Sequence, residues 1–139
     1  MEKVLIIDDN GINLRTAKEA LDDYYEVITV NSCKMALRYL EQHTPDIILL
    51  DIQMPEIDGF ETMAAIRSLP QTEGTPIIFL TAQNNIDDEI RGLELGAVDY
   101  IHKPFQPQIM RMRIRTQLAL ANYQDHLEDI IMQKTEQVA

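Results

Sequence analysis

Residues 3–9 read KVLIIDD, a run of branched apolar residues that ends on two aspartates. Continuous apolar runs of this length are typical of strands that are covered on both faces, as in a parallel sheet flanked by helices. Residues 46–51 (DIILLD) repeat the pattern, and residues 76–81 (PIIFLT) form a third apolar run that ends on a threonine. These three segments are therefore predicted to be central strands of a parallel sheet.

Helical and strand-like segments alternate along the rest of the chain. Ser32 is a predicted N-cap, and Gly96 is expected to stop a helix. The helix after Ser32 is expected to have one apolar face made of Met35, Ala36, Tyr39 and Leu40. The other expected strands are residues 25–30 and 98–102, with a surface loop at 70–76 and helices at 13–23, 33–43, 60–69, 87–95 and 107–135. This alternation predicts the α/β class, with a doubly wound five-stranded parallel sheet and right-handed crossovers.

Polar residues that suit phosphoryl chemistry stand at the ends of the predicted strands: Asp8 and Asp9, Asp51, Thr81, and Lys103. The carboxyl ends of parallel strands meet at one edge of an open α/β sheet, so these side chains are expected to converge there. Three neighbouring carboxylates repel one another and raise at least one pKa unless a divalent cation neutralises them. An all-oxygen cluster without His or Cys suits Mg²⁺ better than Zn²⁺.

Composition limits the classes of protein that fit. At 139 residues and 45% hydrophobic, the chain is long enough for one packed domain with some length left over. No apolar run approaches the ~20 residues that span a bilayer, and the first residues lack the pattern of a secretion signal. The net charge of −11 argues against direct binding of nucleic acid or anionic membranes. The single cysteine, Cys33, excludes an internal disulfide, and we expect a soluble cytoplasmic protein.

The last segment differs from the rest in charge and pattern. Residues 1–107 carry 8 basic and 19 acidic residues, whereas residues 108–139 carry 4 of each. No Gly or Pro interrupts residues 108–135, which predicts a helix of roughly 40 Å at ~1.5 Å per residue. We expect residues 1–120 to form one domain and residues 121–139 to be a helical extension.

This extension has two open interpretations. Apolar spacing typical of a coiled coil covers barely two heptads, at Thr116, Leu120, Tyr123, Leu127 and Ile130, interrupted at either end by Arg113 and Lys134. One interpretation is a final helix that packs its first half on the sheet and frays beyond. The other is a connector helix that pairs with a second copy or leads into an output domain absent from this chain.

The ordered motifs resemble the receiver domain of two-component response regulators over about residues 3–120. The matching pieces are Asp8-Asp9, residues 51–55 (DIQMP) with Asp58-Gly59, residues 80–82 (LTA), and residues 96–101 (GAVDYI) leading to 103–105 (KPF). Their joint order, each at the end of the right strand, carries the resemblance. It implies a flavodoxin-like sheet with strand order 2-1-3-4-5, to which the uninterrupted last segment adds an extended C-terminal helix.

The resemblance implies that Asp51 accepts a phosphoryl group from a sensor histidine kinase or a phosphotransfer protein. It also implies a Mg²⁺ ion, or Mn²⁺ in its place, held by Asp9, Asp51 and the backbone carbonyl of Gln53, with Asp8 acting partly through water. Lys103 would supply a second cation to the phosphoryl oxygens. Independently, a carboxylate is a weak nucleophile, so such a transfer depends on positioning and on neutralising the transferred oxygens.

The resemblance also implies a switch. The hydroxyl of Thr81 would turn toward the phosphoryl group, and Tyr100 would follow it inward. Residues 86–120 would then be the output surface, and this face together with the C-terminal helix could form a homodimer. In the turns, the Lys103–Pro104 bond is a predicted cis peptide, and Gly59 is expected to supply a positive φ.

Each of these residues also has a purely structural interpretation, and two other classes of protein remain open. Asp8 alone would serve as an N-cap, Thr81 as an ordinary strand residue and Tyr100 as a core residue. A Mg²⁺-dependent phosphohydrolase would place a second Asp two residues after its nucleophile, but those positions hold Asn10 and Gln53. A non-catalytic interaction module is the third alternative. The sequence favours a signalling domain that catalyses only its own phosphorylation and dephosphorylation.

Overall fold

The computed structural model describes the backbone of residues 1–138 and side chains through residue 132. Its five strands are β1 (Lys3–Ile7), β2 (Glu26–Val30), β3 (Ile47–Asp51), β4 (Ile77–Ala82) and β5 (Asp99–Lys103). Its helices are α1 (Gly11–Leu21), α2 (Cys33–Leu40), α3 (Gly59–Arg67), a short 3₁₀ turn η1 (Pro70–Thr72), α4 (Ile86–Glu94) and α5 (Pro107–Val138). All strand pairs are parallel, in the order β2-β1-β3-β4-β5, which confirms the predicted fold class and strand order.

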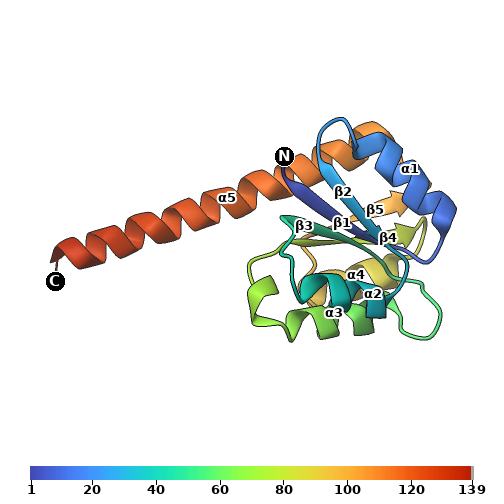
Figure 1. Cartoon of the computed structure of the whole chain (residues 1–139), viewed down its shortest axis with the longest axis horizontal. Helices are drawn as coiled ribbons and strands as arrows, with labels where there is room; N and C mark the ends of the chain where they lie inside the picture. The colour runs from blue at the N-terminus through green and yellow to red at the C-terminus, as the bar shows by residue number, and fades with distance from the viewer. Residues whose placement is uncertain (139) are drawn as a thin grey trace.

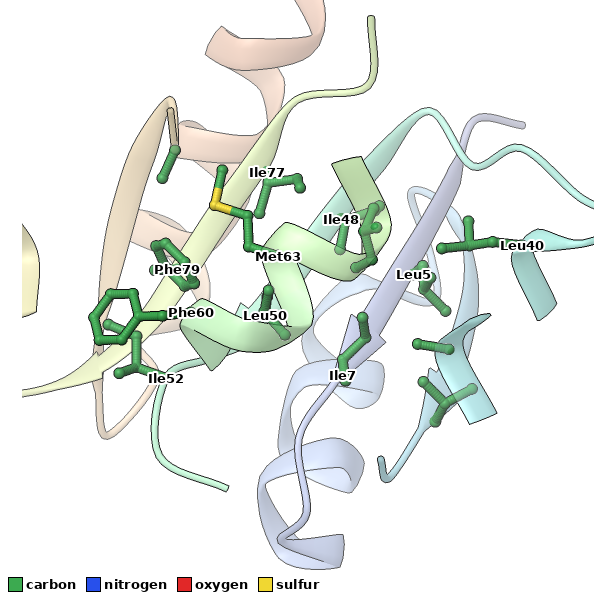
Figure 2. Close-up of a cluster of buried hydrophobic side chains, with 14 residues drawn as sticks. Leu5, Ile7, Leu40, Ile48, Leu50, Ile52, Phe60, Met63, Ile77 and Phe79 are labelled. Atoms are coloured by element: carbon green, nitrogen blue, oxygen red, sulfur yellow. The ribbon is translucent and has the colours of Figure 1, made fainter. Parts of the chain in front are cut away.

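Helices cover both faces of the sheet, with α1 and α5 on one side and α2, α3 and α4 on the other (Figure 1). Alternate residues of one strand therefore enter different cores. In β1, Leu5 and Ile7 pack with α2 and α3, in the cluster drawn in Figure 2, whereas Val4 and Ile6 pack with α1 and α5. This two-sided burial explains why the central strands are continuous apolar runs instead of alternating patterns.

The α2 helix buries most of the face that was predicted, since Ala36 and Leu40 are buried and Tyr39 packs partly buried against the same core. Ser32 is its N-cap, as expected, and accepts a hydrogen bond from the backbone N–H of Met35. The buried residues are Cys33, Ala36 and Leu40, while Met35 is 44% exposed. The prediction was wrong for Met35 alone, because the buried stripe begins at Cys33, the first residue of the helix and two residues earlier than we assumed.

The segment after α3 is more ordered than a surface loop. It contains η1, and Thr72 and Thr75 are both buried. The guanidinium of Arg67 donates hydrogen bonds to the backbone carbonyls of both threonines. These bonds satisfy buried carbonyl groups that the sheet does not reach.

The α5 helix has two parts. Its first turns bury Met110, Ile114 and Leu118 against the sheet, and the remainder projects away from the domain (Figure 1). In the projecting part, Leu120 and Tyr123 are 50% and 61% exposed. The extended helix is confirmed, and its pairing with another chain stays a prediction. No helix within the described residues is long and apolar enough to cross a membrane.

Candidate functional site

Three aspartates meet at the carboxyl edge of the sheet, as predicted. Asp8 directly follows β1, and Asp51 is the last residue of β3. One carboxylate oxygen from each of Asp8, Asp9 and Asp51 lies within 4.8 Å of the others. Asp8 and Asp51 are 0% and 2% exposed, whereas Asp9 is exposed. Two of the three carboxylates are thus withdrawn from water, and the third faces it.

Asp8 is fixed by groups that follow it in the chain. Its Oδ1 accepts a hydrogen bond from the backbone N–H of Asn10 at 2.9 Å, and its Oδ2 accepts one from Nδ2 of Asn13 at 3.3 Å. The N-cap of α1 is Asn10, whose side chain accepts hydrogen bonds from the backbone N–H groups of Ile12 and Asn13. The cap-only interpretation of Asp8 is therefore wrong, and the acid faces the cluster.

Lys103 links the two buried carboxylates. Its Nζ lies 2.8 Å from Oδ1 of Asp51 and 3.3 Å from Oδ2 of Asp8. The Lys103–Pro104 peptide bond is cis, which confirms the predicted turn. Burial of the ammonium disfavours its charged form, but the hydrogen bonds and charges of Asp51 and Asp8 outweigh this effect and raise the pKa of Lys103. The lysine is a permanent cation inside the cluster.

Asp51 has one satisfied oxygen and one without a partner. Its Oδ1 accepts from Lys103 and from the backbone N–H of Gln53 at 3.3 Å. Its Oδ2 is the one buried side-chain oxygen or nitrogen among the described residues that has no hydrogen-bond partner. Burial, assisted by the negative charge of Asp8 and opposed by Lys103 and Gln53, raises the pKa of Asp51 to about 7. A buried oxygen of this kind fits an oxygen-seeking cation or an electrophile.

Thr81 and Tyr100 lie on the neighbouring strands. Thr81 is buried near the end of β4, and its hydroxyl donates to the carbonyl of Ala82 at a long 3.3 Å. Tyr100 is half-buried in β5, with its ring 5.2 Å from the ring of His102 and 5.5 Å from the guanidinium carbon of Arg113. Thr81 pairs in register with His102, so the two predicted switch residues occupy adjacent strands.

Gly59 is essential to the site geometry for a reason different from the one predicted. It has no positive φ, which in this loop belongs to Glu56 at 66°. Instead, a Cβ on Gly59 would lie 2.3 Å from the backbone carbonyl oxygen of Asp51 and 2.6 Å from the Cα of Ile52. Asp58 caps α3 at this point, and only glycine lets the helix start so close to β3.

One residue in direct contact with the cluster was missed from the sequence. Asn13 lies in the first turn of α1, and its contact with Asp8 spans five residues. The sequence did contain one signal for this contact, because Asn13 is a polar amide at the start of the helix predicted after the acidic pair. Gln53, a predicted metal ligand through its carbonyl, is exposed beside Asp51, with its N–H on the Asp51 carboxylate.

The chain is a doubly wound parallel sheet with a lysine-bridged acidic cluster at its carboxyl edge, where open α/β sheets bind ligands. The family model of the response regulator receiver domain, a phosphoacceptor signalling domain, matches residues 4–115. The chain belongs to the response regulator receiver domain family.

Relatives and solved structures support this assignment. A protein named "Probable cyclic di-GMP phosphodiesterase" from Vibrio cholerae is 39% identical over 139 residues, covering 95% of this chain and 32% of the relative. The "Probable transcriptional regulator ycf27" of Guillardia theta is 41% identical over 122 residues, covering 87% of this chain and 47% of the relative. The crystal structure of a "putative response regulator" from Chloroflexus aurantiacus is 36% identical, with a TM-score of 0.81, covering 85% of this chain and 98% of that chain.

The chain spans about a third to a half of the length of these two curated relatives. As a response regulator receiver domain, the chain has a phosphoacceptor signalling role.

Proposed function

We propose that Asp51 is the phosphoryl acceptor, receiving the group from a histidine kinase or a phosphotransfer protein. The observation that carries this proposal is that the two carboxylate oxygens of Asp51 differ in their hydrogen-bond partners. Oδ1 is held by Lys103 at 2.8 Å, while Oδ2 is buried with no partner. The carboxylate is thereby oriented, and one oxygen keeps its lone pairs for a ligand or for phosphorus.

In the proposed transfer, a lone pair of the Asp51 carboxylate forms the new O–P bond. The P–N bond to the donor imidazole breaks, and its electron pair stays on the ring nitrogen. The enzyme-like part of the reaction is positioning and charge neutralisation, since the metaphosphate-like group carries its charge on three equatorial oxygens. Lys103, with its raised pKa, offers a permanent positive charge beside Asp51.

The donor set fits a hard divalent cation, and we propose Mg²⁺, or Mn²⁺ in its place. Asp9, Asp51 and the backbone carbonyl of Gln53 would hold it, with Asp8 acting partly through water. When bound, such an ion neutralises the clustered carboxylates and the oxygens of the transferred group. Asp9 is the exposed carboxylate of the three, so a hydrated ion would reach it directly from solvent.

We further propose a switch built on Thr81 and Tyr100. The present hydrogen bond of the Thr81 hydroxyl is long, at 3.3 Å, so it is easily exchanged for a charge-assisted bond to a phosphoryl oxygen. Such a bond is worth roughly 1.5–3 kcal/mol, enough to shift a balanced equilibrium about ten- to a hundredfold. Tyr100 would then move inward and change the conformation of residues 86–120, the proposed output surface.

The remaining proposals concern the whole protein. Residues 1–120 would be the receiver, and residues 121–139 a linker or dimerisation helix. A homodimer would use α4, β5, α5 and the projecting part of α5. The name of the Vibrio cholerae relative makes a cyclic-dinucleotide enzyme one candidate for an attached output domain. We expect no direct nucleic acid binding, no membrane contact, no enzymatic turnover on other substrates, and a cytoplasmic location.

Incorporation of phosphate from a small phosphodonor such as acetyl phosphate tests the acceptor. The wild type with Mg²⁺ is expected to gain one base-labile phosphate per chain, and Asp51→Asn none. Asp46→Asn is the matched control, because Asp46 precedes the same strand at its opposite end and accepts a hydrogen bond from Lys3 there. Undiminished labelling of Asp51→Asn would place the acceptor elsewhere. Many turnovers on phosphate esters would favour the phosphohydrolase.

A further inference from the structure

Asn13 makes two separate sets of contacts at the start of α1. Its backbone N–H donates to the side chain of the N-cap Asn10 at 3.2 Å, within the helix cap. Its side-chain Nδ2 donates to Oδ2 of Asp8 at 3.3 Å, within the acidic cluster. Asn13 is half-buried, whereas Asp8 is fully buried. A substitution of the side chain therefore removes the contact with Asp8 and leaves the backbone cap in place.

The Oδ2 of Asp8 has two donors that differ in charge. One is the neutral amide of Asn13, and the other is the ammonium of Lys103, also at 3.3 Å. The same ammonium lies closer to Asp51, at 2.8 Å. Two buried carboxylates thus share one cation. The neutral amide of Asn13 supplies Asp8 with a hydrogen bond that the ammonium would otherwise have to supply.

We propose that Asn13 is a positioning residue of the phosphoacceptor site. Its amide determines how the ammonium of Lys103 is divided between Asp8 and Asp51, so that the ammonium stays closer to Asp51. The proposal rests on the proposed role of Asp51. With the amide present, Asp8 is satisfied by Asn10 and Asn13, and the lysine remains on the acceptor. Without it, a fully buried carboxylate oxygen loses a donor, and the remaining cation is drawn toward it.

This division also affects metal binding. A neutral amide orients Asp8 without neutralising it, so the carboxylate keeps its full attraction for a divalent cation. If Lys103 moves onto Asp8, the ammonium competes with the cation for that oxygen. Loss of the Asn13 amide is therefore expected to weaken Mg²⁺ binding more than it slows the reaction at saturating Mg²⁺.

Two variants separate the amide donor from the shape of the side chain. Asn13→Leu removes the donor at similar size, and Asn13→Asp keeps the shape but replaces the donor with a fourth carboxylate. The control is Asn10→Ala, which weakens the cap of α1 but leaves both the Asn13 amide and the backbone N–H that binds Asp8. Since Asn10 is exposed and Asn13 is only half-buried, all three variants are expected to fold.

Thermal unfolding in a metal chelator gives a readout that does not depend on phosphorylation. Asn13→Asp is expected to have a lower Tm than Asn13→Leu, and saturating Mg²⁺ is expected to remove most of that difference. Equal Tm values for the two variants in chelator would overturn the proposal. A packing role alone predicts no additional loss of stability for Asn13→Asp, because aspartate keeps the shape of the asparagine side chain.

Acetyl phosphate labelling against Mg²⁺ concentration gives the second readout. Asn13→Leu is expected to raise the half-saturating Mg²⁺ concentration several-fold with less than a twofold change in maximal rate. Asn10→Ala is expected to leave the half-saturating concentration unchanged. An equal change in both variants would show a structural effect of α1 and contradict the proposal. If the wild type is not labelled at all, the proposed function fails, while the comparison of Tm values still decides the role of Asn13.

Discussion

Lys103 and Asp51 stand 52 positions apart in the chain, and the Nζ of the lysine lies 2.8 Å from Oδ1 of the aspartate. The pairing of β3 with β4 and of β4 with β5 brings the two strand ends together. Both groups are withdrawn from water, at 24% and 2% exposure. Their contact is the basis of the electrostatics of the site, and it makes the lysine the first target for substitution.

Replacing Lys103 by glutamine is expected to destabilise the metal-free protein by about 2–4 kcal/mol, because it leaves two buried carboxylates without their shared cation. Urea unfolding in a chelator measures this loss. The control is Lys18→Gln, since Lys18 pairs with Asp22 on the surface and both side chains are about half exposed. Its expected effect is below about 1 kcal/mol. Equal losses for the two lysines would contradict the assigned role of Lys103.

Stability of the metal-free protein is expected to fall as the pH rises from about 4 to about 7. The pKa of Asp51 is raised from 3.8 to about 7, so in this window the folded protein keeps a proton that the unfolded chain has released. The unfolded state binds fewer protons, and unfolding therefore becomes easier with rising pH. Urea midpoints measured in chelator across this range should show a shallower fall in Asp51→Asn than in the wild type. Parallel curves would mean that Asp51 has an ordinary pKa.

The same proton competes with the metal. Below the raised pKa of about 7, Mg²⁺ must displace a proton from Asp51. Its apparent affinity is expected to fall by about tenfold for each pH unit in that range and to level off above it. Titration calorimetry or tyrosine fluorescence at several pH values measures the dependence. An affinity that stays constant from about pH 5 to about pH 7 would argue against Asp51 as a ligand.

Gly59→Ala is expected to destabilise the fold by about 2 kcal/mol or more, because its Cβ would lie 2.3 Å from the carbonyl oxygen of Asp51. The displaced atoms are backbone atoms beside the acceptor, so labelling should slow as well. Gly74→Ala is the control, since no heavy atom lies within 4 Å of its added Cβ. Similar Tm values for the two variants would show that β3 and α3 are free to separate at this point.

The projecting part of α5 can be tested by truncation. A chain ending at Leu120 lacks most of the exposed apolar residues of that segment, including Tyr123 and Leu127. If the segment pairs two copies, sedimentation should give a dimer for the full chain and a monomer for the shortened one. If both chains sediment in the same oligomeric state, the coiled-coil interpretation is wrong.

Much of the fold could be predicted from the sequence because the sheet is buried on both faces. Residues 47–50 (IILL) are apolar without alternation and fully buried, and such a run is typical of a strand that is covered on both faces. The site followed from the same argument. Asp8, Asp51 and Lys103 each end a strand or follow one directly, and a parallel sheet places these ends on one edge.

The failures have local causes. In α2 the start of the helix was predicted correctly, and the error was confined to Met35, which is exposed because the buried stripe starts two residues earlier, at Cys33. The requirement for glycine at Gly59 comes from the approach of α3 to β3, which no local pattern reports. The contact of Asn13 with Asp8 depends on the angle at which α1 leaves the sheet.

The most direct test is to identify the phosphorylated side chain itself. Borohydride reduces an acyl phosphate on aspartate to homoserine, which peptide mapping by mass spectrometry locates. After treatment with acetyl phosphate and Mg²⁺, we expect homoserine at position 51 and nowhere else, and none when Mg²⁺ is replaced by a chelator. Homoserine at position 8 or 9, or a base-stable phosphate on Thr81, would contradict the account.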